Sequence, residues 1–344
     1  MRRWMALGAA AAALVAAALG TALVLQWARA ELHRPFKGWS GEAASIELEP
    51  GLDAQSILER LGKAGVLERP GLALAWLRLR GGSQTLQAGE YRFDQPLSAI
   101  EVLERLAHGD ILLHPVTIPE GLTLTEIADK LAGDGLGQRD ALLAAFRDPA
   151  PIRDLDPAAV DLEGYLFPDT YRFSRNASPS QIVATLTQRF RVVTGPTYPL
   201  RAAAVGLDLR RAVILASMIE KETSIWAERG RISRVFHNRL GRKMRLECDP
   251  TVRYALERAG HPAARLTLHD LQFESPWNTY RVSGLPVGPI GNPGRASLEA
   301  AVGPVSGDEL FFVAAPGGGH RFSRDLPAHL RAVDAWRAYL ASSR

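Results

Sequence analysis

The chain has 344 residues, of which 47% are hydrophobic and 23% charged, so it can build two or three domains with sizeable cores. Its formal net charge is +4, and setting aside Arg2 and Arg3 leaves 39 basic residues against 37 acidic ones. This balance, with no Lys/Arg run interleaved with aromatics, argues against a nucleic-acid partner. The single cysteine, Cys248, excludes a disulfide framework within the chain.

The N-terminal residues predict a membrane anchor. Residues 4–27 contain no charged side chain, and Trp4 and Trp27 stand at the two ends of this segment. As a helix it would span roughly 36 Å, more than a hydrocarbon core of about 30 Å. Because Arg2 and Arg3 precede it, residues 1–3 should be a cytoplasmic tail, with the remainder periplasmic to a bacterial inner membrane. The alternative is a cleaved signal peptide, because residues 28–30 read Ala-Arg-Ala, although the apolar run is long for one.

Residues 28–44 are expected to form a tether, and residues 45–113 a small α/β module. Hydrophobic periodicity predicts strands at 45–49 and 89–93 and helices at 52–64, 70–80 and 98–108, the last one ended by Gly109. The pattern resembles LysM-type carbohydrate-binding modules, in which a short sheet packs against two helices. A generic α+β spacer without glycan contact is the alternative.

A related pattern opens residues 114–160, which we predict to be a second LysM-like unit and a connector. The strand and turn that lead through Pro50-Gly51 are matched by those that lead through Glu120-Gly121. A threonine cap and a helix over residues 126–131 should follow. The correspondence indicates an internal strand–turn–helix repeat.

Residues 161–344 are predicted to form the catalytic domain of an α+β protein. The patterns indicate helices at 180–192, 208–224 and 226–240, then a hairpin of residues 310–315 and 320–323, and a closing helix at 326–340.

The stretch Leu215-Ala-Ser-Met-Ile-Glu-Lys-Glu-Thr223 indicates acid–base chemistry. An apolar helical run ends there in Glu220 and Glu222. Burial raises the pKa of a carboxyl group, so a glutamate at the end of a buried helix can hold a proton near neutral pH and donate it. Periodicity alone does not choose between the two glutamates.

The helix face that carries Glu220 also carries Val213, Ala216 and Ser217, small side chains that should leave room for a ligand. Glu222 lies on the other side. The alternative is that both glutamates are solvated in a last turn, or are ion-paired with Arg210, Lys221 or Arg229.

Further along, Asp249-Pro250 is typical of a helix start, with Asp249 as the capping residue. In Trp277-Asn278-Thr279-Tyr280, two aromatic rings suited to stacking on sugars flank an amide and a hydroxyl group. A turn with buried aromatics is the alternative. Residues 284–294, rich in Gly and Pro, should form a rigid loop that lines a groove. The sequence contains no zinc motif, so we expect neither a metal nor a cofactor.

Six motifs taken in order resemble the YceG-like family of membrane-anchored endolytic murein transglycosylases, and the resemblance covers nearly the whole chain. They lie at residues 162–171, 215–223, 235–240, 249–251, 277–280 and 284–286. The resemblance implies that Glu220 is the catalytic residue and that peptidoglycan glycan strands are the substrate. We predict that the substrate-binding residues are Glu222, Asp249, Trp277, Asn278, Thr279 and Tyr280. Glu247-Cys248, where a Gln-Thr type pair is expected, and Trp277, where a tyrosine is usual, depart from the family's pattern and bear on substrate contacts.

The resemblance also implies the reaction, which is cleavage of the MurNAc–GlcNAc β-1,4 bond without water. Glu220 would protonate the leaving oxygen and then take the proton of the MurNAc C6 hydroxyl, which closes a 1,6-anhydro ring. The high effective molarity of intramolecular attack lets one carboxylate suffice, unlike in paired-carboxylate glycosidases. By the same resemblance, the chain would end nascent glycan strands beside peptidoglycan synthases of the elongation or division machinery.

Two other functions stay open. One is a lysozyme-like hydrolase, with Glu222 or Asp249 as a second carboxylate. The other is a non-catalytic glycan-binding scaffold of the cell envelope.

Overall fold

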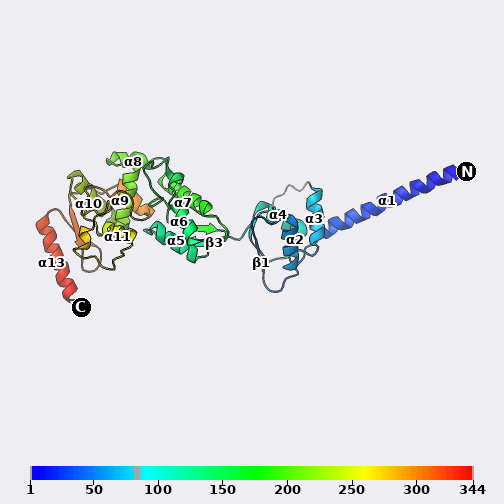
Figure 1. Cartoon of the computed structure of the whole chain (residues 1–344), viewed down its shortest axis with the longest axis horizontal. Coiled ribbons are helices and arrows are strands. Elements are labelled where there is room, and N and C mark those ends of the chain that lie inside the picture. Colours follow the sequence, from blue (N-terminus) through cyan, green and yellow to red (C-terminus); the bar gives the residue numbers. More distant parts are fainter. Residues whose placement is uncertain (1, 81–85, 343–344) are drawn as a thin grey trace. The chain divides into compact units, whose positions relative to one another are not determined.

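The computed structural model describes residues 2–80 and 86–342, which fold as two compact units (Figure 1). The first unit runs to His114 and includes residues 174–176, and the second comprises residues 115–173 and 177–344. Among the described residues the strands form three two-stranded sheets, and helices make up most of the remainder. The predicted mixed α+β class is therefore confirmed.

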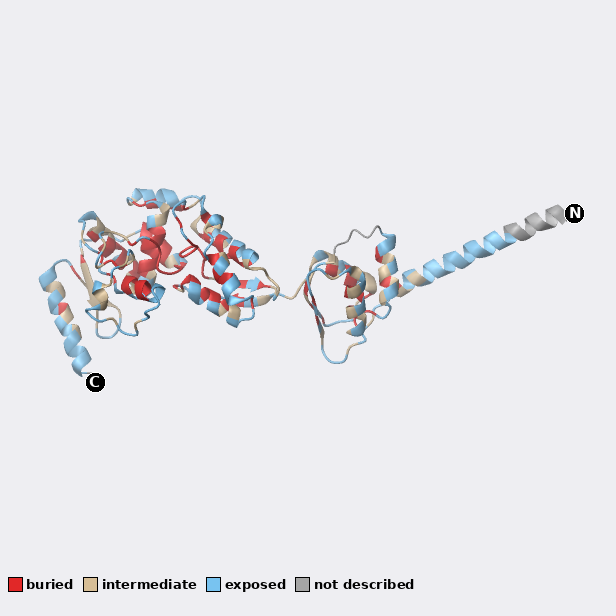
Figure 2. Ribbon diagram, viewed as in Figure 1, coloured by how far each residue is buried: buried red, intermediate tan, exposed pale blue. Residues whose placement is uncertain are grey.

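Helix α1 (Arg2–Leu32) is longer than the predicted anchor. From residue 12 onward it is long and apolar enough to cross a membrane, with a mean hydropathy of 1.5 over its most apolar window, none of which is buried (Figure 2). The segment expected to be a tether is helical as far as Leu32, and it pairs with the module where Phe36 bridges to Leu97.

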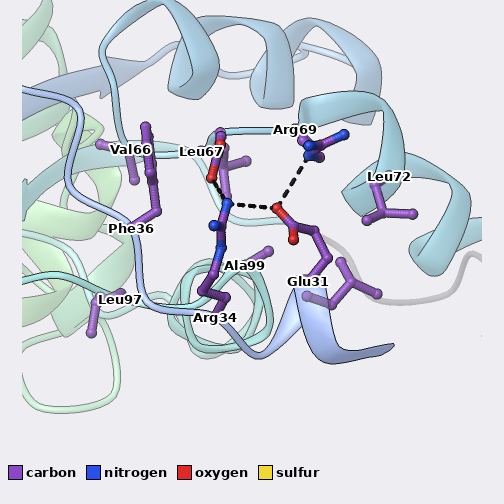
Figure 3. Close-up of a pocket in the computed structure, with 11 residues that line it drawn as sticks. Glu31, Arg34, Phe36, Val66, Leu67, Arg69, Leu72, Leu97 and Ala99 are labelled. Atoms are coloured by element: carbon purple, nitrogen blue, oxygen red, sulfur yellow. Dashed lines mark hydrogen bonds and ion pairs between the residues drawn. The ribbon is translucent and has the colours of Figure 1, made fainter. Parts of the chain in front are cut away.

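The base of α1 is fastened to the first unit by an ion-pair network (Figure 3). The Glu31 carboxylate lies 2.8 Å from the Arg34 guanidinium and 3.1 Å from that of Arg69, and Arg34 also contacts Glu68. The Arg69 guanidinium stacks over the Trp27 ring at 5.3 Å. These contacts hold the end of α1 against the start of the second helix of the module.

The module packs a two-stranded antiparallel sheet against three helices. Ile46 lies opposite Tyr91 in the sheet, and the apolar faces of the helices cover its inner side. Ser98 forms a capping box with Glu101, and left-handed Gly109 ends the last helix as predicted. The LysM-like assignment stays a prediction. The elements are β1 (Ala44–Leu48), α2 (Ala54–Lys63), α3 (Pro70–Leu79), β2 (Gly89–Phe93) and α4 (Ala99–His108).

The strand–turn–helix pattern predicted after the module is present, as β3 (His114–Thr117), a turn at Gly121 and α5 (Leu124–Gly133). Thr123 caps α5 and forms a capping box with Glu126. From residue 115 onward this segment belongs to the core of the second unit, where α5 packs against α6, so the structure does not set residues 114–160 apart as a separate unit.

Helix α9 (Leu209–Glu222) is the centre of the second unit. Every residue from Ala212 to Ile219 is buried, and the helix packs against α8, α10, α11 and α12 (Figure 2). The short helices α8 and α12 were not predicted. The other elements are α6 (Arg139–Phe146), η1 (Ala150–Ile152), β4 (Thr170–Phe173), α7 (Pro179–Thr194), α8 (Tyr198–Ala204), η2 (Trp226–Glu228), α10 (Arg229–Gly241), α11 (Asp249–Arg258), η3 (Asp270–Gln272), α12 (Arg295–Val302), β5 (Phe311–Ala314), β6 (His320–Ser323) and α13 (Leu326–Ser342).

Candidate active site

Glu220 stands in the last turn of α9 with both carboxylate oxygens engaged. Its Oε1 accepts a hydrogen bond from Arg229 Nη2 at 3.0 Å, and its Oε2 accepts one from the Gly294 backbone N–H at 2.9 Å. Gly294 is the N-cap residue of α12, so the carboxylate also lies at the positive end of a helix. The Glu220 side chain is only 6% exposed. A buried helix thus delivers a carboxylate whose two oxygens are each held by a hydrogen-bond donor from a distant segment.

Arg229 links Glu220 to a second carboxylate. It is the first residue of α10, and its Nε donates to Ser297 Oγ at 3.0 Å. Its Nη2 also lies 3.6 Å from Glu120 Oε2. Partial burial and the charge of Glu220 raise the pKa of Glu120, and Arg229 opposes that shift. Two carboxylates therefore share one guanidinium.

The sequence did not predict that Arg229 and Glu120 meet Glu220 in one site. Its patterns indicated Arg229 only as an alternative ion-pair partner of the two glutamates, and Glu120 only as part of the strand–turn–helix repeat. The signal for Glu120 was a turn that ends with left-handed Gly121, which places a carboxylate at a corner of the backbone.

The helix face before Glu220 is filled, so the prediction that it leaves room for a ligand was wrong. Val213, Ala216 and Ser217 are fully buried. Ser217 Oγ accepts the Ile290 backbone N–H at 3.1 Å, which draws the loop of residues 288–294 over this face. This face of α9 therefore has no open space in front of residues 213–217.

Glu222 has a different environment from Glu220. Burial raises its pKa to about 7, the charge of Asp249 adds to the shift, and a hydrogen bond with the Cys248 thiol opposes it. Burial and the nearby Glu222 carboxylate in turn raise the pKa of that thiol. The structure thus separates the two glutamates, with Glu220 on Arg229 and Glu222 beside Cys248.

Asp249 does not cap α11, which corrects that prediction. Cys248 holds the N-cap position, and Asp249 is the first helical residue. Its Oδ1 instead accepts a hydrogen bond from the Tyr280 hydroxyl at 2.7 Å. Asp249 is exposed and Tyr280 is half-buried, so this pair remains available to a ligand.

Asn278 and Thr279 lie in the core, which corrects the prediction that they contact substrate. Both are fully buried. Asn278 Nδ2 donates to two backbone carbonyls, and Thr279 Oγ1 accepts the Cys248 backbone N–H at 2.9 Å. The Trp277 ring packs against the Tyr254 ring, and the Arg258 guanidinium lies over it. The segment holds α11 in place through polar groups that the sequence suggested for sugar recognition.

A buried carboxylate, Glu163, fastens the two segments that flank Glu220. It accepts hydrogen bonds from the Leu124 backbone N–H at 3.0 Å, Asn292 Nδ2 at 2.9 Å and the Tyr254 hydroxyl at 3.1 Å. Burial, with Asp161 nearby, raises the pKa of Glu163 to about 8. Asn292 also bonds the Leu122 carbonyl. This hub joins the turn of residues 120–124 to the loop that supplies Gly294.

A cavity of about 970 Å³ lies beside residues 123–126, at the start of α5. Glu163 lies in its wall with Glu126, whose carboxylate is 4.0 Å from Lys221 Nζ. The cavity therefore adjoins the Glu-Lys-Glu segment, although Glu220 is not part of its lining. Within residues 2–80 and 86–342, no group of three or more His, Cys, Asp or Glu side chains is arranged to hold a metal ion.

A buried glutamate held by an arginine and a helix N-terminus defines a carboxylate-centred site, on an α+β chain whose N-terminal helix is long and apolar enough to cross a membrane. The chain belongs to the YceG-like family, whose profile matches residues 46–335.

Named relatives agree with this membership. An endolytic murein transglycosylase of Bacillus subtilis is 30% identical over 89% of this chain and 88% of its own length. One from Streptococcus pneumoniae is 28% identical over 81% of this chain, which spans 56% of that longer relative. A crystal structure of a YceG-like protein from Listeria monocytogenes superimposes with a TM-score of 0.57 at 30% identity, covering 85% of this chain and 99% of that one.

Proposed function

We propose that this chain is a membrane-anchored endolytic murein transglycosylase in which Glu220 is the general acid and then the general base. The observation that carries the proposal is the position of Glu220, where α9, Arg229 and the N-terminus of α12 converge on one carboxylate. The activity named for relatives at 28–30% identity supports the same reaction.

The reaction needs one proton carried in two directions. Glu220 donates its proton to the glycosidic oxygen as the bond to the MurNAc anomeric carbon breaks, and GlcNAc leaves as an alcohol. Arg229 and the Gly294 N–H stabilise the carboxylate that remains. This carboxylate then takes the proton of the MurNAc C6 hydroxyl, whose oxygen bonds to the anomeric carbon. The product is a 1,6-anhydro end, and Glu220 is protonated again.

A hydrolase requires a second carboxylate to activate water. Glu222 and Asp249 are engaged with Cys248 and Tyr280, whereas Glu120 shares Arg229 with Glu220. Glu120 is therefore the residue that separates the two mechanisms. In the lytic reaction it tunes the shared guanidinium, and in a hydrolytic reaction it would be indispensable.

The test compares the full-length wild type with Glu220→Gln and Glu120→Gln on uncrosslinked peptidoglycan strands, with products read by mass spectrometry. We expect wild-type fragments one water lighter than hydrolysis products, none from Glu220→Gln, and the same light fragments at a reduced rate from Glu120→Gln. Reducing-end fragments that disappear in Glu120→Gln would establish a hydrolase. Binding without cleavage by every protein would support a scaffold.

Trp226 is proposed as a stacking surface for the strand. It is 76% exposed and lies in η2, between the end of α9 and Arg229. Glu228 fixes this connection by accepting hydrogen bonds from the His320 backbone N–H and the Thr223 hydroxyl. An exposed indole on the short connection between Glu220 and Arg229 suits the apolar face of a sugar. The exposed Asp249–Tyr280 pair is proposed as a second contact.

Replacement of Trp226 tests this contact. Trp226→Ala should raise KM about tenfold with kcat within a factor of two, because stacking contributes roughly 1–1.5 kcal/mol. Trp226→Phe should recover most of the loss, and Leu200→Ala, at an exposed site on α8, should behave as wild type. An unchanged KM in Trp226→Ala would remove the residue from the site.

Anchoring by α1, with the N-terminus cytoplasmic and the second unit periplasmic, would place this chemistry where nascent strands emerge. Strand termination beside a synthase follows from that location as the proposed role. Protease added to spheroplasts should degrade the second unit, and protection of that unit would contradict this orientation.

A further inference from the structure

Helix α3 has an outer face that is unusual for a helix in water. Among its ten residues Arg78 is the one charged side chain, and the others are apolar, glycine or proline. Ala73 and Leu77 are buried on the module core, whereas Ala75 and Leu79 are exposed, Leu79 at 79%. Helices at a protein surface normally place polar side chains on the face away from the core. The outer face of α3 therefore fits a partly apolar environment.

Two exposed arginines border this face, Arg78 within the helix and Arg80 directly after it. Arg69 and Glu68, at the start of the helix, are paired with Glu31 and Arg34. The Arg80 guanidinium stacks over the Trp76 ring at 4.7 Å, so the aromatic and basic groups are held together. Apolar, aromatic and arginine side chains on one helix are typical of helices at a membrane interface, where the rings and stems are buried and the charges meet anionic headgroups.

The geometry of the first unit sets α3 at the same depth as the end of the membrane anchor. Trp27 is the last residue of the apolar span, and it carries the Arg69 guanidinium over its ring. Helix α3 begins at the next residue, Pro70, and contacts α1. In Figure 1, α3 lies at the edge of the first unit where α1 departs, and it runs across the direction of α1. Tryptophans at the ends of spanning helices lie at the level of the headgroups, so α3 would lie at this level when α1 crosses the bilayer.

We infer that α3 is a membrane-surface helix that lays its outer face on anionic phospholipid headgroups and so holds the first unit flat against the bilayer. This inference rests on the proposed role of α1 as an anchor. The Glu31 network fixes α3 to the base of α1 before any lipid is bound (Figure 3). Such preorganisation lowers the entropy cost of the contact.

The test measures the depth of nitroxide labels on the full-length chain in nanodiscs of mixed phosphatidylethanolamine and phosphatidylglycerol. Cys248 is buried, so labels are directed to single introduced cysteines. Leu79→Cys reports on α3, Leu19→Cys on the anchor, and Ser45→Cys on β1, on the other side of the first unit from α1 in Figure 1. The readout is the ratio of collision rates with oxygen and with a water-soluble nickel chelate.

We expect labels at residues 79 and 19 to favour oxygen at least fivefold more than the label at residue 45. A label at residue 79 that matches residue 45, while residue 19 is in lipid, would overturn the inference and leave the anchor intact. Labels at both residues 19 and 79 in water would overturn the anchor as well. Neither result bears on the cleavage chemistry of Glu220, which the product analysis tests separately.

Charge reversal tests the lipid class. Arg78→Glu combined with Arg80→Glu should move the label at residue 79 toward water in anionic nanodiscs. The matched control combines Arg242→Glu with Arg245→Glu on the exposed surface of the second unit. It has the same change in net charge and should leave the depth of the label at residue 79 unchanged. An unchanged depth in the α3 variant would overturn the assignment to anionic headgroups.

Discussion

Two strand–turn–helix segments, β1 to α2 and β3 to α5, have the same local structure and different surroundings. Each turns at a left-handed glycine, Gly51 with φ of 88° and Gly121 with φ of 80°, and each helix begins at a side-chain cap. A Cβ on Gly51 would meet no atom within 4 Å, whereas one on Gly121 would lie 3.4 Å from Glu220 Cγ. The first turn faces open space, and the second lies against Glu220 in the candidate active site.

The difference arises from what packs against each corner. The turn after β3 is held by two backbone hydrogen bonds, from the Gly121 N–H to the Asn292 carbonyl and from the Asn292 N–H to the Leu122 carbonyl, and by Glu163. These partners are distant in the chain, and together they bring Glu120 to Arg229. Two copies of one local structure therefore differ in surroundings because tertiary contacts draw only the second to Glu220 and Arg229.

The largest expected effect comes from replacing Arg229, which contacts Glu120 at the second turn. The matched comparison is Arg60, which contacts Glu49 at the first turn. Arg229→Met should lower kcat at least 100-fold and cost about 3 kcal/mol of stability, because it leaves the buried Glu220 without a cation. Arg60→Met removes the exposed Arg60–Glu49 pair at the first corner and should cost less than 1 kcal/mol.

Cleavage assays and denaturant unfolding check both variants, and Arg229→Lys, which keeps the charge without the guanidinium fork, should fall between wild type and Arg229→Met. Cleavage by folded Arg229→Met within threefold of wild type would show that Glu220 works without the arginine.

The two turn glycines provide a matched pair of intermediate effect. Gly51→Ala and Gly121→Ala should each cost about 1–2 kcal/mol, because both positions require a left-handed backbone. Only Gly121→Ala should also lower kcat, by about tenfold, since relaxation of its strained backbone would displace Glu220. Unfolding and strand-cleavage measurements on both variants give the answer. Equal kcat values for Gly51→Ala and Gly121→Ala would mean that the turn at Gly121 has no part in catalysis.

Taken over a single pH unit, the smallest expected effect is a change of stability with pH. The pKa of Glu163 is raised to about 8 from an ordinary 4.5, so the folded second unit binds a proton that the unfolded chain releases in this window. Its contribution to stability is present below pH 4.5 and is lost as pH rises toward 8, by up to about 1.4 kcal/mol per pH unit. Hydrogen bonds from Ser56 lower the pKa of Asp53, so its contribution is lost only as pH falls into the acid range.

Hydrogen exchange of the α9 amides between pH 5 and 8 measures how the free energy of unfolding changes with pH, once the rates are corrected for intrinsic exchange. Glu163→Gln should flatten the slope and Asp53→Asn should leave it unchanged. A wild-type slope that persists in Glu163→Gln would assign the proton to another group, such as Glu222, whose pKa is raised to about 7.

Sequence reasoning predicted most elements whose signals are local. The capped helix that ends at Gly109 and the hairpin of β5 and β6 were predicted within a residue or two, because caps, turn residues and alternation act over short distances. Short helices such as α8 were missed, because one or two turns carry little periodicity. Asn278 and Thr279 were misread because the same polar groups serve a ligand or a buried network equally well.

The sequence by itself determined that an apolar helix begins the chain, that another ends in Glu-Lys-Glu, and that two similar corners precede capped helices, since each depends on neighbours along the chain. Only the tertiary structure decided that Glu220, and not Glu222, meets Arg229 and Gly294, which lie 9 and 74 residues further on. Periodicity orients a side chain on its own helix, whereas the partner that it meets depends on how distant segments pack together.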